Sequence, residues 1–237
     1  MVSLLPLDVR GASVRKGGAV LLDNIDLTLS GGGATIVIGP NGSGKTTLLR
    51  LLHGLERARG GTVTWSCDPT LAQPAQAFVF QTPIILRRSV LENVIYPLTT
   101  RGVARKAALE RGQVWLDKVG LADTADMRAT RISGGEKQKL ALARALITEP
   151  SVVFLDEPCS SLDGAATKDI EATLKAAVSG GTRVIMSTHD LGQARRLANE
   201  VVLMVKGRIL EHNAAADFFR TPETPECAAF LKGDIIA

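Results

Sequence analysis

The most informative stretch of this sequence is Gly39-Pro40-Asn41-Gly42-Ser43-Gly44-Lys45-Thr46-Thr47. An apolar run precedes it at residues 34–38, and a leucine-rich segment follows it at residues 48–52. This order predicts a buried strand, a glycine turn and a helix, the setting that a phosphate-binding loop of the form G-x-x-x-x-G-K-[ST] requires. In such a loop the backbone N–H groups and the helix dipole attract phosphate. We expect Lys45 to reach the β- and γ-phosphates and the Thr46 hydroxyl to hold Mg²⁺.

Composition limits the class of protein. The chain has 237 residues, of which 45% are hydrophobic and 22% are charged, as in one α/β domain with a full core. It has no apolar run of about 18 residues, and residues 1–8 lack a basic segment followed by a long apolar one, so we expect it to stay in the cytosol. Its three cysteines are scattered, which favours a reducing compartment. The net charge of +4 is spread along the chain and does not call for a nucleic-acid partner.

The first half of the chain alternates between strand and loop patterns. Residues 4–13 and 20–29 alternate apolar and polar side chains on either side of a glycine turn, which predicts a hairpin. A short strand is expected at residues 61–66, followed by a polar, proline-containing loop through Pro74. Another short strand, residues 77–80, ends at Gln81, which is either a polar strand end or a functional side chain.

The segment after Gln81 joins an apolar loop to a helical region. The loop contains Ile84, Ile85 and Leu86 and either tucks into its own domain or presents a surface to a partner. Residues 89–118 have a helical period. Ser133-Gly134-Gly135-Glu136 then opens a second clear helix, in which Ser followed three residues later by Glu is a capping box.

The second half supplies acidic residues at the end of a buried strand. Residues 152–155 are apolar and lead directly into Asp156-Glu157. Carboxylates at the carboxyl end of a parallel strand lie at the sheet edge where α/β proteins bind ligands. One acid can hold Mg²⁺ while the next acts on an attacking water. A helix at residues 164–178 and a strand at residues 183–187 follow, and that strand leads to His189.

The chain closes with a hairpin and a short tail. We expect hairpin strands at residues 201–205 and 208–210. The tail carries Phe218-Phe219 and Phe230-Leu231, two short amphipathic turns that we expect to cover the edge of the core.

The order and spacing of these motifs resemble the ATP-binding cassette ATPases across nearly the whole chain. The resemblance rests on the phosphate loop, Gln81, the Ser133 helix, the Asp156-Glu157 strand, Ser161-Leu162-Asp163 and His189, and the segment 132–136 looks like the family's signature motif. It implies an α/β fold with a phosphate-loop NTPase core, an N-terminal antiparallel β-subdomain and an inserted α-helical subdomain at about residues 82–148. The chain as a whole, residues 1–237, would be one such domain.

The resemblance also implies a role for each residue that carries it. Those expected to bind ATP are the phosphate loop, Gly39, Pro40, Asn41, Gly42, Ser43, Gly44, Lys45, Thr46 and Thr47, and, from a second subunit, Ser133, Gly134, Gly135 and Glu136. Asp163 belongs to the same expected ATP sites and would couple the two sites across the interface. Glu157 would polarise the hydrolytic water, His189 would contact the γ-phosphate, and Gln81 would act as a sensor of a membrane partner. The Mg²⁺ ligands would be Thr46, Gln81 and Asp156. Two subunits would enclose two ATP molecules.

One departure from the family pattern affects the adenine. The family usually places an aromatic residue before the first glycine of the N-terminal hairpin, and here Lys16 stands there beside Arg15, with no Tyr, Trp or Phe nearby. We expect the base to be held by a cation over its face or only weakly, which puts selectivity for ATP over GTP in doubt.

The biological task follows from the resemblance rather than from residue chemistry. A cassette without a membrane span is expected to drive a separate permease, docked at the loop of Ile84, Ile85 and Leu86, at the cytoplasmic face of the membrane. Residues 49–55 and 189–198 and the tail resemble the ATPase subunits of bacterial tungstate importers, which implies oxyanion uptake with a periplasmic or surface solute-binding protein. Alternatives are import of phosphate or polar amino acids, lipoprotein or lipid export, and soluble iron–sulfur cluster assembly.

Overall fold

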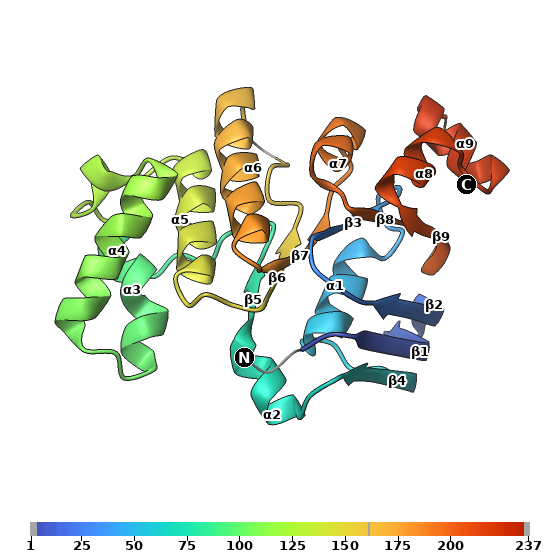
Figure 1. Ribbon diagram of the computed structural model, residues 1–237, viewed down its shortest axis with the longest axis horizontal. Coiled ribbons are helices and arrows are strands. Elements are labelled where there is room, and N and C mark those ends of the chain that lie inside the picture. Colours follow the sequence, from blue (N-terminus) through green and yellow to red (C-terminus); the bar gives the residue numbers. More distant parts are fainter. Residues whose placement is uncertain (1–3, 161, 235–237) are drawn as a thin grey trace.

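The structure is a computed structural model that describes residues 4–160 and 162–234. Two sheets and a group of helices make up the molecule (Figure 1). The strands are β1 (Leu7–Lys16), β2 (Ala19–Leu29), β3 (Ala34–Ile38), β4 (Gly60–Trp65), β5 (Gln76–Val79), β6 (Val152–Asp156), β7 (Arg183–Ser187), β8 (Glu200–Val205) and β9 (Arg208–Ala214). The helices are α1 (Lys45–His53), α2 (Pro69–Ala72), α3 (Val90–Thr100), α4 (Arg105–Val119), α5 (Gly134–Leu146), α6 (Gly164–Ser179), α7 (Leu191–Leu197), α8 (Ala215–Arg220) and α9 (Pro225–Lys232).

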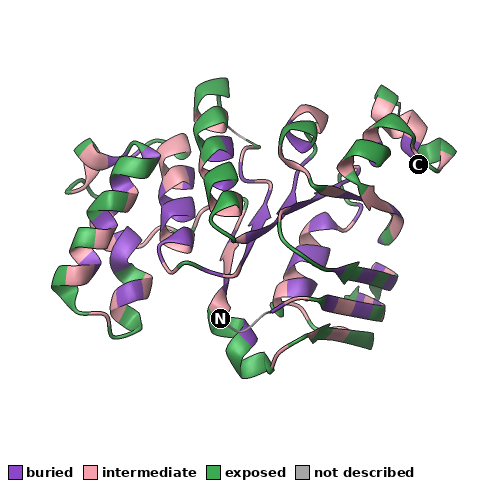
Figure 2. Ribbon diagram, viewed as in Figure 1, coloured by how far each residue is buried: buried purple, intermediate pink, exposed green. Residues whose placement is uncertain are grey.

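The central sheet has the strand order β5-β6-β7-β3-β8-β9 and is parallel except for its last pair. Every residue of β3, β6 and β7 is buried, because helices cover both faces (Figure 2). Successive side chains of β3 point to opposite faces of the central sheet. Val37 packs with α1 and the N-terminal sheet, whereas Ile36 and Ile38 pack with α6 and α7. The carboxyl ends of β3, β6 and β7 therefore meet along one edge of the sheet.

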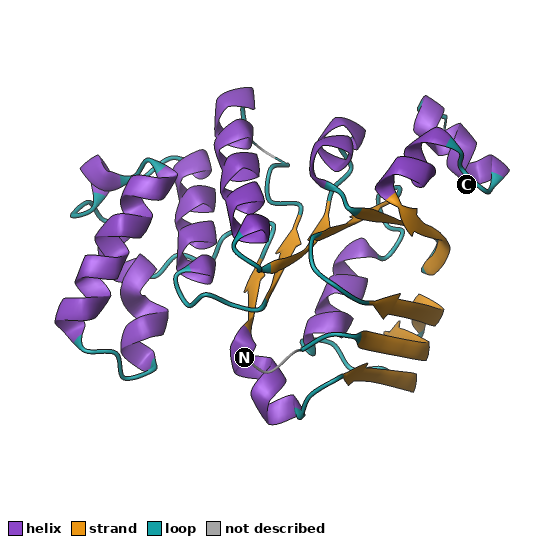
Figure 3. Ribbon diagram, in the orientation of Figure 1, coloured by secondary structure: helices purple, strands orange, loops and turns teal. Residues whose placement is uncertain are grey.

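The N-terminal sheet is antiparallel, in the order β2-β1-β4. Its pairing of Leu7 with Leu29 and of Lys16 with Ala19 confirms the hairpin expected from the alternating pattern. The register shifts between Val9 and Ala12 and again between Ala12 and Val14, near Asn24, which has a φ of 52°. This sheet covers α1, so that α1 lies between the two sheets (Figure 3).

Helices α3, α4 and α5 form a group at the far end of the molecule from the N-terminal sheet, with a hydrophobic cluster of their own (Figure 1). Buried members of this cluster include Val94, Leu116 and Leu140. Residues 101–104 interrupt the helical pattern of residues 89–118, dividing it into α3 and α4. The α/β fold with an antiparallel β-subdomain and a helical insertion is thus confirmed, while its expected boundaries at about residues 82–148 stay a prediction.

One local expectation needs correction. The proline-containing segment expected as loop contains α2 and a 3₁₀ turn, η1 (Gln73–Ala75), and a second 3₁₀ turn, η2 (Ala122–Thr124), follows α4. Asp68 caps α2, because its side chain accepts a hydrogen bond from Thr70 N, and Pro69 occupies the first helical position. Among the described residues, no helix is both long and apolar enough to cross a membrane.

Candidate nucleotide site

The phosphate loop joins the carboxyl end of β3 to the N-terminus of α1. Gly44 is the N-cap residue of α1 and has a φ of 103°, in the left-handed region that favours glycine. A Cβ on Gly39, which has a φ of 145°, would collide with the Met204 carbonyl oxygen. The loop is also fixed from outside, since Gly207 N donates to Ser43 O at 2.9 Å. These constraints leave a backbone loop at a helix N-terminus, the geometry that binds phosphate.

Lys45 is the first residue of α1 and lies within the loop. Its ammonium group is 3.0 Å from Gly39 O and 3.2 Å from Pro40 O, and 3.6 Å from Glu157 Oε1. The side chain is only 6% exposed. A nearly buried cation held by two loop carbonyls is an electrostatic partner for phosphate at a fixed position.

Thr46 and Asp156 meet at the sheet edge. Thr46 Oγ1 donates to Asp156 Oδ1 at 2.8 Å, and Ser187 Oγ donates to the same carboxylate oxygen at 2.8 Å. Asp156 ends β6 and is 2% exposed. A hydroxyl beside a carboxylate provides hard oxygen ligands of the kind that Mg²⁺ prefers, completed by phosphate oxygens. The pair therefore fits the expected metal, whereas Gln81 contacts Glu157 and Ser160 instead.

Glu157 forms the centre of a second group of side chains. Its Oε2 atom is 3.1 Å from His189 Nδ1 and 3.4 Å from Gln81 Nε2. Glu157 has a φ of 43°, and its backbone N–H donates to Ser187 Oγ at 3.0 Å. The strained backbone and this hydrogen bond fix the carboxylate at the mouth of the cleft. A carboxylate between a histidine and an amide can accept a proton from a water that attacks the phosphate held near Lys45.

These groups line one cleft of about 1060 Å³, together with Val20, Leu21, Lys206, Gly207 and Phe230. Neither Arg15 nor Lys16 lines it, and both are exposed on the hairpin. No aromatic residue lies near Lys16 in the sequence, but a distant one does line the cleft. Phe230 reaches the cleft from the C-terminal helix α9, a placement that no local sequence motif indicates.

A second set of expected residues lies away from this cleft. Ser133, Gly134, Gly135, Glu136 and Asp163 are absent from its lining. Ser133 caps α5, because Glu136 N donates to Ser133 Oγ at 3.2 Å and Ser133 N donates to Glu136 Oε2 at 2.7 Å. Hydrogen bonds from Ser133, first its side chain and then its backbone, lower the pKa of Glu136. Asp163 caps α6 through Ala166 N, and Ser161 lies outside the described residues.

A family model described as ABC transporter matches residues 22–160. This chain belongs to the ABC transporter family. It is 35% identical to the arginine transport ATP-binding protein of Bacillus subtilis, over 95% of this chain and 98% of that protein. It is also 35% identical to a phosphate import ATP-binding protein of Natronomonas pharaonis, over 97% of this chain and 87% of that protein.

The solved structures agree with the sequence comparisons. An ATP-binding cassette determined as a dimer with ADP and phosphate bound has a TM-score of 0.77 and 25% identity, covering 88% of this chain and 98% of that one. The ABC ATPase fold expected from the sequence is thus confirmed, and the chain is an ATPase subunit of an ABC transporter.

In this ABC ATPase, the loop after Gln81 is held by two polar side chains. Leu86 N donates to Asn93 Oδ1 at 2.9 Å, and Arg144 Nη2 donates to Ile84 O at 2.6 Å. These bonds turn the Ile84 side chain outward, 60% exposed, while Ile85 packs against the helical cluster. The two isoleucines therefore differ, although the sequence pattern treats them alike.

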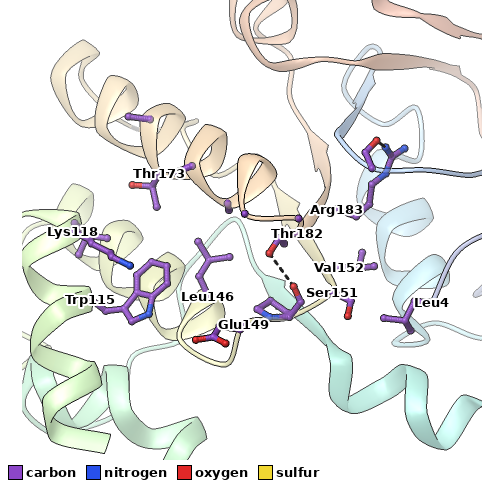
Figure 4. Close-up of a pocket in the computed structure, with 18 of the residues that line it drawn as sticks. Leu4, Trp115, Lys118, Leu146, Glu149, Ser151, Val152, Thr173, Thr182 and Arg183 are labelled. Atoms are coloured by element: carbon purple, nitrogen blue, oxygen red, sulfur yellow. Dashed lines mark hydrogen bonds between the residues drawn. The ribbon is translucent and has the colours of Figure 1, made fainter. Parts of the chain in front are cut away.

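The ABC ATPase has another cavity, of about 1360 Å³, at the opposite edge of the central sheet (Figure 4). Leu146, Val152, Thr173 and Arg183 line it, and the last three lie on β6, α6 and β7. Val152 and Arg183 are the first residues of their strands. The cavity therefore lies at the amino ends of the strands, away from the phosphate loop and from the edge at which such sheets bind nucleotides.

Proposed function

We propose that this chain is the ATP-hydrolysing subunit of an importer that takes up a small polar solute through a separate permease. The observation that carries the proposal is the single cleft in which Lys45, Glu157 and His189 converge on the phosphate loop. That arrangement has the parts that phosphoryl transfer to water requires, namely a phosphate cradle, a cation and a base. The relatives named above, which transport arginine and phosphate, support the importer direction.

The proposed chemistry assigns one task to each group. Lys45 and the loop N–H groups bind the β- and γ-phosphates, and Thr46 with Asp156 holds the Mg²⁺, which neutralises phosphate charge when bound. Glu157 accepts the proton of the attacking water, and His189, 3.1 Å from Glu157, orients that carboxylate and contacts the γ-phosphate. Gln81 contacts Glu157 and precedes the loop of Ile84 and Leu86. It is therefore proposed to transmit the binding of a partner at that loop to the catalytic carboxylate.

The proposed active unit is a homodimer of two cassettes. Ser133 and Gly134 are exposed at the N-terminus of α5, where the positive end of the helix dipole points to solvent. Facing a second copy, this N-terminus completes the phosphate cleft that lacks it within one chain, and Asp163 lies close to the same boundary. The dimeric neighbour with ADP and phosphate supports this assembly.

The permease is proposed to dock on the loop of Ile84 and Leu86, which places this subunit at the cytoplasmic face of the membrane. A groove of about 340 Å³ adjoins the loop and is lined by Phe80, Pro83, Ile84 and Tyr96 among others. Apolar side chains and a concave surface suit an amphipathic helix of a partner. Ile84 is the exposed contact, so Ile84→Asp is the informative variant.

Two solute classes remain as candidates. A tetrahedral oxyanion is supported by the phosphate-importing relative, and tungstate belongs to that chemical class. A polar amino acid is supported by the arginine-transporting relative. A solute-binding protein outside the membrane is proposed to deliver the solute, because the ATPase subunit itself does not contact it.

Uptake by intact cells tests this function. A strain lacking the gene would carry the native chain, Lys45→Ala or, as a matched control, the exposed-surface variant Lys168→Ala. We would measure cellular tungsten by elemental mass spectrometry and uptake of labelled phosphate and arginine, each at trace concentration. Loss of one solute in Lys45→Ala alone identifies the cargo. Equal uptake of every solute in all three strains would contradict the importer assignment and direct attention to export or to soluble cluster assembly.

A further inference from the structure

The nucleotide cleft has two chemically different ends. The phosphate loop, Glu157 and His189 form the charged end. Gln81 and Ser160 lie with the charged end, and the other end is lined by Val20, Leu21, Lys206, Gly207 and Phe230, which offer aliphatic and aromatic side chains beside one cation. Apart from His189, Phe230 is the one aromatic side chain among the described residues that line the cleft. A nucleotide anchored by its phosphates at the charged end has its base at this second end.

Phe230 is held in place by the way α9 is attached to the sheet. Glu211 of β9 is 4% exposed and accepts hydrogen bonds from Glu223 N at 3.2 Å and from Thr224 Oγ1 at 3.1 Å. Thr224 in turn caps α9 by accepting from Cys227 N. Cys227 is fully buried, and Phe230 lies one helical turn later and is only half-buried. The helix is therefore fixed by its first turn and exposes part of the Phe230 ring at the cleft.

The other wall of this end is fixed as well. The Lys206-Gly207 turn between β8 and β9 is attached to β2, because Asp23 N donates to Gly207 O at 2.9 Å and Arg208 Nε donates to Asp23 Oδ2 at 3.0 Å. Leu21 and Val20 lie on the same strand, β2, close to this turn. Both sides of this end of the cleft, one aliphatic and one aromatic, are therefore anchored to the rest of the chain.

We infer that Phe230 is the aromatic platform on which the nucleotide base stacks, in place of the cationic hairpin residues. The inference rests on the proposed ATPase site and specifies how that site holds the base. Stacking uses the face of the ring, which every purine offers, and it adds affinity without reading the base edge. The site should therefore accept adenine and guanine nucleotides about equally, and Lys16 should contribute little.

Binding of products, which are not hydrolysed, tests this role. Calorimetry would give the Kd of Mg-ADP, Mg-GDP and Mg-pyrophosphate for the native chain, Phe230→Ala, Phe230→Trp and Lys16→Ala. Phe219→Ala is the matched control, because Phe219 also belongs to the tail but packs on Phe218 and Arg195 rather than lining the cleft. We expect Phe230→Ala to weaken ADP and GDP by about tenfold, to leave pyrophosphate unchanged, and Phe230→Trp to restore both nucleotides.

The outcomes separate this inference from the function on which it rests. Equal ADP affinity in the native chain and Phe230→Ala, or a loss confined to Lys16→Ala, would overturn the platform and leave the ATPase site intact. Equal loss of ADP and pyrophosphate in Phe230→Ala would mean that the residue only supports the fold, which also overturns it. A native chain that binds neither ADP nor pyrophosphate would refute the nucleotide site itself.

Discussion

The phosphate cleft and the N-terminus of α5 contain the two halves of the proposed catalytic site, and they differ in how complete they are. In the cleft, Lys45 and His189 both contact Glu157 within a single chain. At α5, the side chains of Ser133 and Glu136 bond to each other's backbone N–H groups, and their helix end faces solvent. The cleft lacks only a positive group facing the γ-phosphate position from the open side. The N-terminus of α5 has the partial positive charge of a helix end but faces no phosphate site in the described part of its own chain.

This difference indicates which functions one chain can perform alone. The cleft of one chain holds the loop, the lysine and the proposed Mg²⁺ ligands, so we expect it to bind a nucleotide without a partner. Turnover needs the transition-state charge to be surrounded by donors, and in the proposed dimer a second α5 supplies that enclosure. Binding by a monomer and hydrolysis by a dimer is therefore the expected division, and variants in the two regions should separate the two steps.

The largest effect is expected from Glu157→Gln, which alters the cleft alone. Losing the water-activating carboxylate should lower turnover by about 10²–10⁴-fold while the phosphate contacts remain. ATP should then hold two copies together, because the closed state forms but does not react. Phosphate release and gel filtration with Mg-ATP measure both effects. A variant that turns over slowly yet stays monomeric with ATP would break the proposed link between the two regions.

Most of the cleft was predictable from the sequence, because its residues are fixed by local patterns. A buried apolar run followed by glycines and Lys45 specifies a strand, turn and helix, and the run before Asp156 places the acids at the sheet edge. The position of Phe230 was not predictable in this way. It depends on how hydrogen bonds to Glu211 of β9 anchor the start of α9, which no short-range sequence pattern indicates.

The loop after Gln81 shows a second limit of the sequence pattern. Ile84 and Ile85 are adjacent residues in a segment without periodicity, so nothing local indicates which of them points outward. Asn93 and Arg144 decide it, through hydrogen bonds to the loop backbone from α3 and α5. Helix α2 was missed for another reason. Asp68-Pro69 has the form of a helix start, but the prolines of the segment favoured a loop.

A smaller effect on turnover, about 10²-fold, is expected from Ser133→Ala, with ATP binding by the monomer unchanged. The loss of a cap alone would cost about 0.5–2 kcal/mol of stability and would not by itself stop hydrolysis. Urea unfolding and phosphate release distinguish these two contributions. A folded Ser133→Ala protein with native turnover would contradict the assignment of α5 to the partner's cleft.

Mixing variants sharpens that test. In a mixture of Ser133→Ala with Lys45→Ala, the mixed dimer has one site with native Lys45 facing native Ser133, and a second site lacking both. We expect activity to recover well above that of either variant alone, since one complete site forms. The control mixes Ser133→Ala with a second chain that carries both Lys45→Ala and Glu157→Gln. This mixture should recover the same activity, because its one complete site is unchanged. No recovery in either mixture would indicate that Ser133 acts within its own chain.

The smallest effect is on stability and depends on pH. The pKa of Glu136 is lowered by hydrogen bonds from Ser133, so the folded chain favours the ionised carboxylate more than the unfolded chain does. The stabilisation is therefore present above the unfolded pKa, about 4.5, and is lost as pH falls through the lower folded value. We expect Glu136→Gln to destabilise the protein by up to about 1 kcal/mol at pH 7 and by less near pH 4. Urea unfolding of both proteins across that range measures the difference.

Nucleotide affinity at pH 7 should be the same in the native chain and in Glu136→Gln, because Glu136 binds Ser133 rather than a group in the cleft. A change in that affinity would show that α5 and the cleft are coupled within one chain.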